Sequence, residues 1–244
     1  SSIFQRGWLE SQVLITSGQF AVTTFGQVSF WLILLLMFYT VESLQRERSA
    51  RLAPIYCATP TKTFAVLAGK SLANSLVAVV VLAATFLGGA IALLYQHKTP
   101  LQMTPFVLVW GLMLVPTFLL WTSFVSFVYS LTANRYASYA IALGVVVVTG
   151  LGVGFNKLTW ALNWPLWGAL QWSDISVFEI DRSALVLNRL AALTGAVVCL
   201  VLAVRFYPRV ESDPQRIMHR LAPRPLFFSL LKALAVAAVP LILV

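Results

Sequence analysis

The sequence predicts an all-α, multi-pass membrane protein with about six transmembrane helices. Hydrophobic residues make up 59% of the 244 residues and charged residues only 10%, whereas about a quarter of the residues in a soluble domain are charged. The mean hydropathy is +0.86. Uncharged stretches of about 20 residues recur along the chain, which is the length that a helix needs to cross about 30 Å of hydrocarbon. These stretches lack the polar face of a soluble core helix.

The first four spans are runs without charge, and they are expected at residues 21–41, at 71–95, within 99–134 and at 136–156. The third run is mostly apolar after Pro105. Pro105 and Pro116 are expected to kink it, because proline removes one hydrogen bond of a helix and its ring displaces the preceding turn.

The fifth and sixth spans are less regular. Only fifteen uncharged residues separate Arg189 from Arg205, so both arginines are expected to extend their aliphatic stems and hold the guanidinium groups at the interface. A basic cytoplasmic linker, 207–224, would follow. The run 225–244 is apolar except for Lys232 and stops without a polar flank, so the sixth span is expected to be truncated.

The orientation follows from the basic residues, because lysine and arginine favour cytoplasmic loops. With alternating crossings, twelve of the 17 fall on one side, which is therefore predicted to be the cytoplasm: Arg46, Arg48, Arg51, Lys62, Lys70, Arg135, Arg205, Arg209, Arg216, Arg220, Arg224 and Lys232. The net charge of +9 is explained by this topology, so a nucleic-acid partner is not expected. Both ends of the chain would lie outside, and since residues 1–20 lack a signal-peptide pattern, at least one further span is expected before Ser1 and more chain after Val244.

The segment 41–70 has seven charges between two uncharged spans. Its first half suits an amphipathic helix along the inner membrane surface. Apolar residues of that helix fall near one face and polar residues near the other: Val41, Leu44, Leu52, Ile55 and Tyr56 against Gln45, Arg46, Ser49 and Arg51. Glu47 precedes Arg51 by four residues, the favourable order for a helical ion pair. On the residues alone, this segment either binds a partner or only anchors the loop to anionic lipid.

The string from Glu42 to Lys70 resembles the signature loop of the ABC-2 type permeases, the membrane subunits of ATP-driven transporters. The resemblance is carried by its RER and SAR pieces, by Ala58, Thr59 and Pro60, and by Gly69 and Lys70 at the next span. It implies the type V ABC transporter-like bundle, with a coupling helix that docks on a cytoplasmic ATPase. The residues that would make this contact are Glu42, Arg46, Glu47, Arg48, Arg51, Leu52, Ile55, Tyr56, Ala58, Thr59 and Pro60.

A narrower resemblance covers nearly the whole chain. The pieces FYTVESLQRERSARLAPIYCATP, LTANRYASYAIAL, WSDIS and LNRLAALTGAVVCLVLAVRFYPR are similar to the second permease unit of bacterial proteins that join two ABC-2 units to an extracytoplasmic zinc aminopeptidase domain. Residues 1–206 would then be an ABC-2 transmembrane domain without its first span, and 225–244 an additional span. One departure is Pro54, which falls inside the presumed coupling helix and is expected to end or kink it near Ala53.

The resemblance implies a permease, in the direction of export, in a bacterial inner membrane. Its partners would be ABC ATPase subunits, a second permease unit (a homodimer or the other half of one polypeptide) and the lipid bilayer. ATP and magnesium would bind to the ATPase and no cofactor to this chain. The alternative is a membrane anchor or scaffold that presents a peptidase domain and transports nothing.

Other classes find little support in the residues. His97 and His219 are the two histidines, both beside loops, and no H-E-x-x-H or G-x-S-x-G motif occurs, so we expect neither a catalytic nor a metal site. Secondary transporters mark their ion path with ionisable groups at mid-membrane, and the predicted spans have such groups only at their ends. An energy source outside the membrane is therefore favoured.

The remaining features concern the outer segment and the cysteines. Trp160, Trp164 and Trp167, followed by Trp172, are predicted to form an aromatic belt or a re-entrant interfacial helix broken by Pro165, and lining a substrate exit is the alternative. Cys57 would be cytoplasmic and Cys199 mid-span, so the two are not expected to pair.

Overall fold

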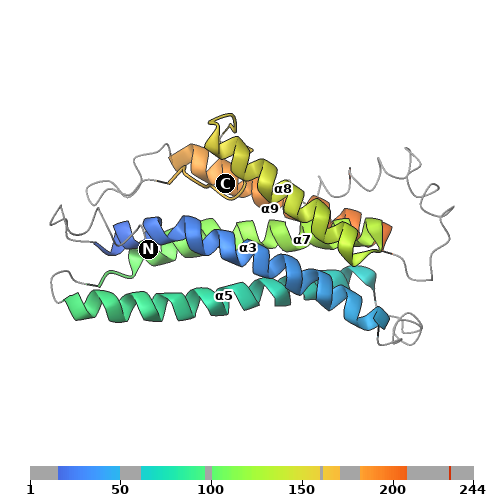
Figure 1. Cartoon of the computed structure of the whole chain (residues 1–244), viewed down its shortest axis with the longest axis horizontal. Coiled ribbons are helices and arrows are strands. Elements are labelled where there is room, and N and C mark those ends of the chain that lie inside the picture. The colour runs from blue at the N-terminus through green and yellow to red at the C-terminus, as the bar shows by residue number, and fades with distance from the viewer. Residues whose placement is uncertain are drawn as a thin grey trace.

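The computed structural model describes residues 16–49, 62–96, 101–159, 162–170 and 182–207, together with Leu231. Within these ranges the chain forms helices and turns and no β-strand (Figure 1). The elements are α3 (Ser17–Ser49), α5 (Thr63–Gln96), α6 (Thr104–Phe106), the π-helix η1 (Val107–Leu114), α7 (Val115–Thr132), α8 (Arg135–Gly154) and α9 (Arg182–Phe206).

Five stretches of helix in the described part of the chain are long and apolar enough to cross a membrane: Ser17–Arg46, Thr63–Tyr95, Thr104–Thr132, Arg135–Gly154 and Ser183–Phe206. The first four confirm the four spans predicted from uncharged runs. The fifth begins several residues earlier than predicted, and this lengthening carries Arg189 inside the helix. The sixth predicted span and the basic linker before it lie outside the described residues, apart from Leu231.

The ends of the helices follow from local chemistry. At the start of α3, the hydroxyl of Thr16 accepts a hydrogen bond from the N–H of Gln19 at 3.3 Å, which caps one of the N–H groups that have no partner inside a helix. Between α7 and α8, Ala133 has a φ of 50° and Asn134 caps α8 by accepting a hydrogen bond from Tyr136 N at 2.9 Å. This tight turn makes α7 and α8 antiparallel neighbours.

Of the two prolines expected to kink the third span, Pro105 stands at its beginning, where proline is tolerated, and only Pro116 lies inside it. Pro105 lies in the first turn of α6 and Pro116 in the first turn of α7, and the eight residues of η1 between them form a π-helix. Since Pro116 has no N–H, it cannot donate to the carbonyl of Leu112, four residues before it. Long π-helices are rare, and π-helical turns are frequent at functional sites. The junction of η1 and α7 is therefore a candidate functional position.

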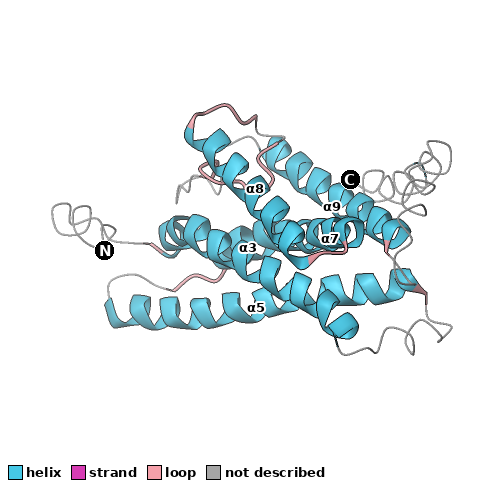
Figure 2. Cartoon of the chain, turned by 45° about the vertical axis from the view of Figure 1, so that its right-hand side comes forward, coloured by secondary structure: helices cyan, strands magenta, loops and turns pink. Residues whose placement is uncertain are grey.

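The helix α7 lies at the centre of the bundle. It packs against α3, α5, α8 and α9, and 61% of the apolar window of its span is buried, against 22–39% for the other four. Figures 1 and 2 show α5 along one side, α8 and α9 along the other, and α3 with α7 between them. The third span is therefore enclosed by protein, while the others present apolar faces outward, as expected toward lipid.

Alternating helix directions divide the bundle into two ends. We call the end at which α3 and α7 finish and α5 begins the loop end, and the opposite end the far end. Because α3 and the third span run parallel, polar side chains connect them along their whole length. The connections are Ser17 Oγ with Gln102 N (3.1 Å), Trp110 Nε1 with Ala21 O (3.0 Å), Trp121 Nε1 with Ile33 O (2.8 Å) and Tyr129 OH with Gln45 Oε1 (2.6 Å).

Candidate functional site

The helices on either side of the charged loop, α3 and α5, are joined by hydrogen bonds at the loop end. Lys70 of α5 donates through Nζ to the carbonyl oxygen of Ser43 at 2.9 Å. One turn further along α5, Asn74 Nδ2 donates to the hydroxyls of Thr40 and Ser43 at 3.4 and 3.3 Å. Asn74 is 7% exposed, and buried polar groups that found no partner would be costly. These bonds hold the last turns of α3 against the first turns of α5.

Two tyrosines extend this attachment to α7 and α8. Tyr129 is fully buried and its hydroxyl donates to Gln45 Oε1 at 2.6 Å. Tyr139 of α8 donates to Glu42 Oε1 at 2.9 Å. A bond to a charged acceptor is worth roughly 1.5–3 kcal/mol net, and one between neutral groups about 0.5–1.5 kcal/mol. The end of α3 is therefore attached to three other helices.

Residues 41–49 correct one prediction. They continue α3 without interruption to Ser49, and Val41 and Leu44 are fully buried against the bundle. The apolar face predicted for a separate surface helix thus packs into the bundle in its first turns. A single helix that extends from the membrane is stiffer than two helices joined by a turn, so the loop begins from a rigid support.

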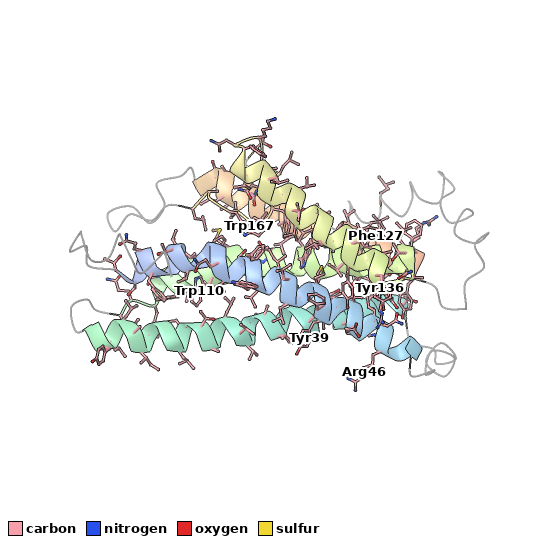
Figure 3. The ribbon with its side chains drawn as sticks, viewed as in Figure 1. Tyr39, Arg46, Trp110, Phe127, Tyr136 and Trp167 are labelled. Carbon is pink, nitrogen blue, oxygen red and sulfur yellow. The ribbon has the colours of Figure 1, made fainter. Side chains whose placement is uncertain are left out.

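Only Glu42 and Arg46 of the predicted ATPase-contact residues have side chains that the structure describes. Glu42 is exposed and bonded to Tyr139, while Arg46 is exposed and projects away from the bundle at the loop end (Figure 3). The backbones of Glu47 and Arg48 lie in the last turn of α3. The rest of the set lies outside the described residues: Arg51, Leu52, Ile55, Tyr56, Ala58, Thr59 and Pro60, together with Pro54.

The tryptophan-containing segment is the second notable feature, at the far end. We call residues 162–170 the turn segment, because they form turns. Trp164 and Trp167 therefore do not lie on the interfacial helix that their spacing suggested, and Trp160 and Trp172 are outside the described residues. Asn163 shapes the segment, since its side chain exchanges hydrogen bonds with the backbone of Trp167 at 2.9 and 3.2 Å.

Both described tryptophans of the turn segment point into the bundle. The Trp164 ring stacks on Trp121 with a centroid separation of 5.1 Å and an interplanar angle of 8°, and its Nε1 donates to Thr149 of α8 at 3.2 Å. Trp167 Nε1 donates to Ser29 of α3 at 2.8 Å, and Figure 3 shows this side chain between α8 and α3. An aromatic belt faces lipid headgroups, whereas these rings attach the turn segment to three helices.

The structure overturns the prediction for Arg189. Its guanidinium was expected at the interface, yet the residue lies seven positions inside α9, about 10 Å along the helix axis. It is 4% exposed and bonded to residues of η1, α7 and the turn segment. The adjacent Asn188 was the one signal in the sequence, because it is a second polar residue in an otherwise apolar run.

These features define the class of protein: the chain is a multi-pass helical membrane protein, with a polar attachment at the loop end and a buried arginine near the far end. In comparisons with protein-family models, curated proteins and solved structures, the chain matched none. The described residues include no group of three His, Cys, Asp or Glu side chains that would hold a metal ion.

Proposed function

We propose that the chain is the membrane subunit of an ATP-driven ABC transporter, of the ABC-2 permease type and in the direction of export. The loop end would face the cytoplasm of a bacterial inner membrane, and the segment 42–60 would bind a separate ATPase subunit that carries ATP and magnesium. The resemblance of this segment to the ABC-2 signature loop is the sequence argument. A second permease unit would complete the transporter.

The observation that supports the proposal best is the attachment of the two ends of the loop. Lys70 and Asn74 hold α5 to α3, and Tyr129 and Tyr139 hold α3 to α7 and α8. A displacement of the loop would therefore move several helices together and would not be lost in a flexible connection. This is what a coupling element requires, since closure of an ATPase dimer acts on the membrane part as a rigid-body movement.

Each part of the loop would have a distinct role. The basic residues Arg46, Arg48 and Arg51 would meet acidic side chains or carbonyl groups of the ATPase, which suits the several donors of a guanidinium group. The apolar residues Leu52, Ile55 and Tyr56 would fill a cleft on its surface. Residues 58–60 would set the angle at which the chain returns to α5.

Copurification of the full-length protein from its native membrane tests the proposal. The expected result is a nucleotide-binding subunit in stoichiometric amount and magnesium-dependent ATP hydrolysis by the complex. Replacing both Arg51 and Leu52 by glutamate should remove the ATPase subunit. The control is Lys157→Glu, which reverses an exposed charge at the far end of the bundle and should leave the complex intact.

Two results would contradict the proposal. Retention of the ATPase by the Arg51→Glu/Leu52→Glu variant, with unchanged hydrolysis, would show that the segment is not the coupling element. Absence of any ATPase from the wild-type preparation, with an intact peptidase domain present, would favour the anchor or scaffold alternative.

A further inference from the structure

The guanidinium of Arg189 has every one of its hydrogen-bond donors occupied. An arginine carries five N–H groups in a rigid planar arrangement, and five hydrogen bonds are present. Nε donates to Asn188 Oδ1 at 3.1 Å, Nη1 to Met113 O at 2.6 Å and Thr117 Oγ1 at 2.7 Å, and Nη2 to Trp164 O at 2.8 Å and again to Asn188 Oδ1.

These acceptors belong to parts of the chain that are far apart in sequence. Met113 and Thr117 lie on either side of Pro116, where η1 passes into α7, and Trp164 lies in the turn segment. Thr117 Oγ1 also approaches Trp164 O at 3.3 Å. A single buried side chain therefore joins α9, the third span and the turn segment at one point.

The acceptors of Arg189 are all neutral. Glu42 is the one carboxylate among the side chains that the structure describes, and it lies at the loop end. A buried cation without a counter-ion is stable only while its hydrogen bonds are complete. If the turn segment moved away, the guanidinium would lose Trp164 O as an acceptor and would gain water in its place.

The turn segment also contacts the two central helices, α7 and α3. Its Trp164 ring lies flat against Trp121 of α7, and its Trp167 bonds to Ser29 of α3. A shift of α7 relative to α3 would act directly on these contacts. Arg189 is thus placed where a movement of the helices would be converted into a movement of the turn segment.

We propose that Arg189 is a positioning residue that latches the turn segment, residues 162–170, onto the junction of η1 and α7 and so closes the far end of the bundle. Opening of the far end would release Trp164 O from the guanidinium and admit water to the cation. The inference goes beyond the proposed coupling to an ATPase and does not depend on it, since it rests on the contacts of Arg189 alone.

Cysteine accessibility in the full-length protein, reconstituted in lipid vesicles, tests the latch. The background carries Cys57→Ser and Cys199→Ala. The reporter is Leu170→Cys, a position of the turn segment that is 8% exposed and is not one of the hydrogen-bond partners of Arg189. The measured quantity is the rate of modification by a small water-soluble maleimide, which reacts only with hydrated thiols. A second reporter, Val125→Cys in the middle of α7, is fully buried and detects general unfolding.

The latch predicts that Arg189→Ala raises the modification rate of the Leu170→Cys reporter about tenfold or more, which corresponds to about 1.4 kcal/mol at 25 °C. The Val125→Cys reporter should stay protected. Arg189→Lys should give an intermediate rate, because an ammonium group has three donors and no planar fork. Arg205→Ala, at the loop end of the same helix, should leave the rate unchanged.

The proposal would be overturned if Arg189→Ala left the modification rate of the Leu170→Cys reporter unchanged. It would also be overturned if this reporter stayed as fully protected in Arg189→Ala as in Arg189→Lys. If Arg189→Ala instead exposes both reporters, Thr117→Val decides, because it removes one acceptor of Arg189 and one contact to Trp164 O while keeping the shape of the side chain. The latch predicts a rise of a few-fold confined to the Leu170→Cys reporter. No rise in Thr117→Val would equally overturn the proposal.

Discussion

Two consecutive glycines of α5 allow the packing of the far end to be tested with one matched pair of variants. A Cβ atom added at Gly89 would lie 2.5 Å from Cε1 and 2.9 Å from Cζ of Phe20 in α3. A Cβ added at Gly88 would meet nothing within 4 Å. Gly89→Ala and Gly88→Ala therefore change the same chemistry at adjacent helical positions, and only Gly89→Ala creates a clash.

The magnitude of the difference follows from the environment of Phe20. Alanine in place of a helical glycine gains about 0.5–1 kcal/mol, and this term is shared by both variants and cancels between them. Overpacking costs about 1–3 kcal/mol. The Phe20 ring is partly buried and its centroid lies 6.2 Å from that of Phe106, so it can turn outward and relieve part of the clash. We expect Gly89→Ala to be less stable than Gly88→Ala by about 1–2 kcal/mol.

Thermal unfolding in detergent, followed by size-exclusion chromatography at matched heating times, measures this difference. For a chain of this size, 1 kcal/mol corresponds to roughly 2–4 °C in Tm, so Gly89→Ala should melt about 2–8 °C below Gly88→Ala. Phe20→Leu combined with Gly89→Ala should recover most of the loss, because the shorter side chain vacates the space. Equal melting of the two alanine variants would refute the contact between α3 and α5 at this level.

Three further predictions concern other parts of the bundle. Trp121→Ala should lower the free energy of unfolding by about 3–5 kcal/mol, because the ring is 1% exposed and donates to Ile33 O. Trp31→Ala, 68% exposed, should change it by about 0.5 kcal/mol or less, and equal losses in the same thermal assay would count against the enclosed position of the third span. Asn134→Ala should cost about 1 kcal/mol by removing the cap of α8, which the same assay would detect as a lower Tm. Tyr129→Phe should leave ATPase binding intact and lower the amount of transport per ATP hydrolysed, measured in proteoliposomes, whereas an unchanged ratio would count against the role of its hydrogen bond in coupling.

The positions of the spans were predictable because they depend on composition alone. Hydrocarbon excludes charge over about 30 Å, so runs without lysine, arginine, aspartate or glutamate locate the helices whatever their tertiary contacts. The irregularity at Pro116 was also predictable, since proline removes a helical hydrogen bond locally, whereas Pro105 begins the span and does not kink it. The π-helix that precedes Pro116 had no signal in the sequence.

Local sequence gave only one indication of the position of Arg189, the adjacent polar residue Asn188. An arginine near the end of an apolar run usually extends to the interface, and that rule gave the wrong location here. The guanidinium is held inside by carbonyl oxygens of Met113 and Trp164, which every residue possesses and which therefore leave no mark in the sequence. The inward orientation of Trp164 and Trp167 was also missed, because their partners are two hydroxyl groups and the ring of Trp121, all on other helices.

The continuation of α3 to Ser49 could not be predicted from the sequence, for a different reason. The apolar face formed by Val41 and Leu44 was found correctly, but a pattern of apolar residues fits a lipid surface and a helix bundle equally well. The hydrogen bonds of Gln45 and Glu42 to Tyr129 and Tyr139 decide between the two. Those pairs join residues more than eighty positions apart.

The central claim is that the charged loop between α3 and α5 faces the cytoplasm and receives an ATPase. Modification of the native Cys57 in the full-length protein, with Cys199→Ala, tests it most directly, using a membrane-impermeant maleimide on intact cells and on inverted membrane vesicles. Rapid modification in inverted vesicles alone, slowed when the ATPase subunit is bound, is the predicted result. Modification of Cys57 in intact cells would contradict the account.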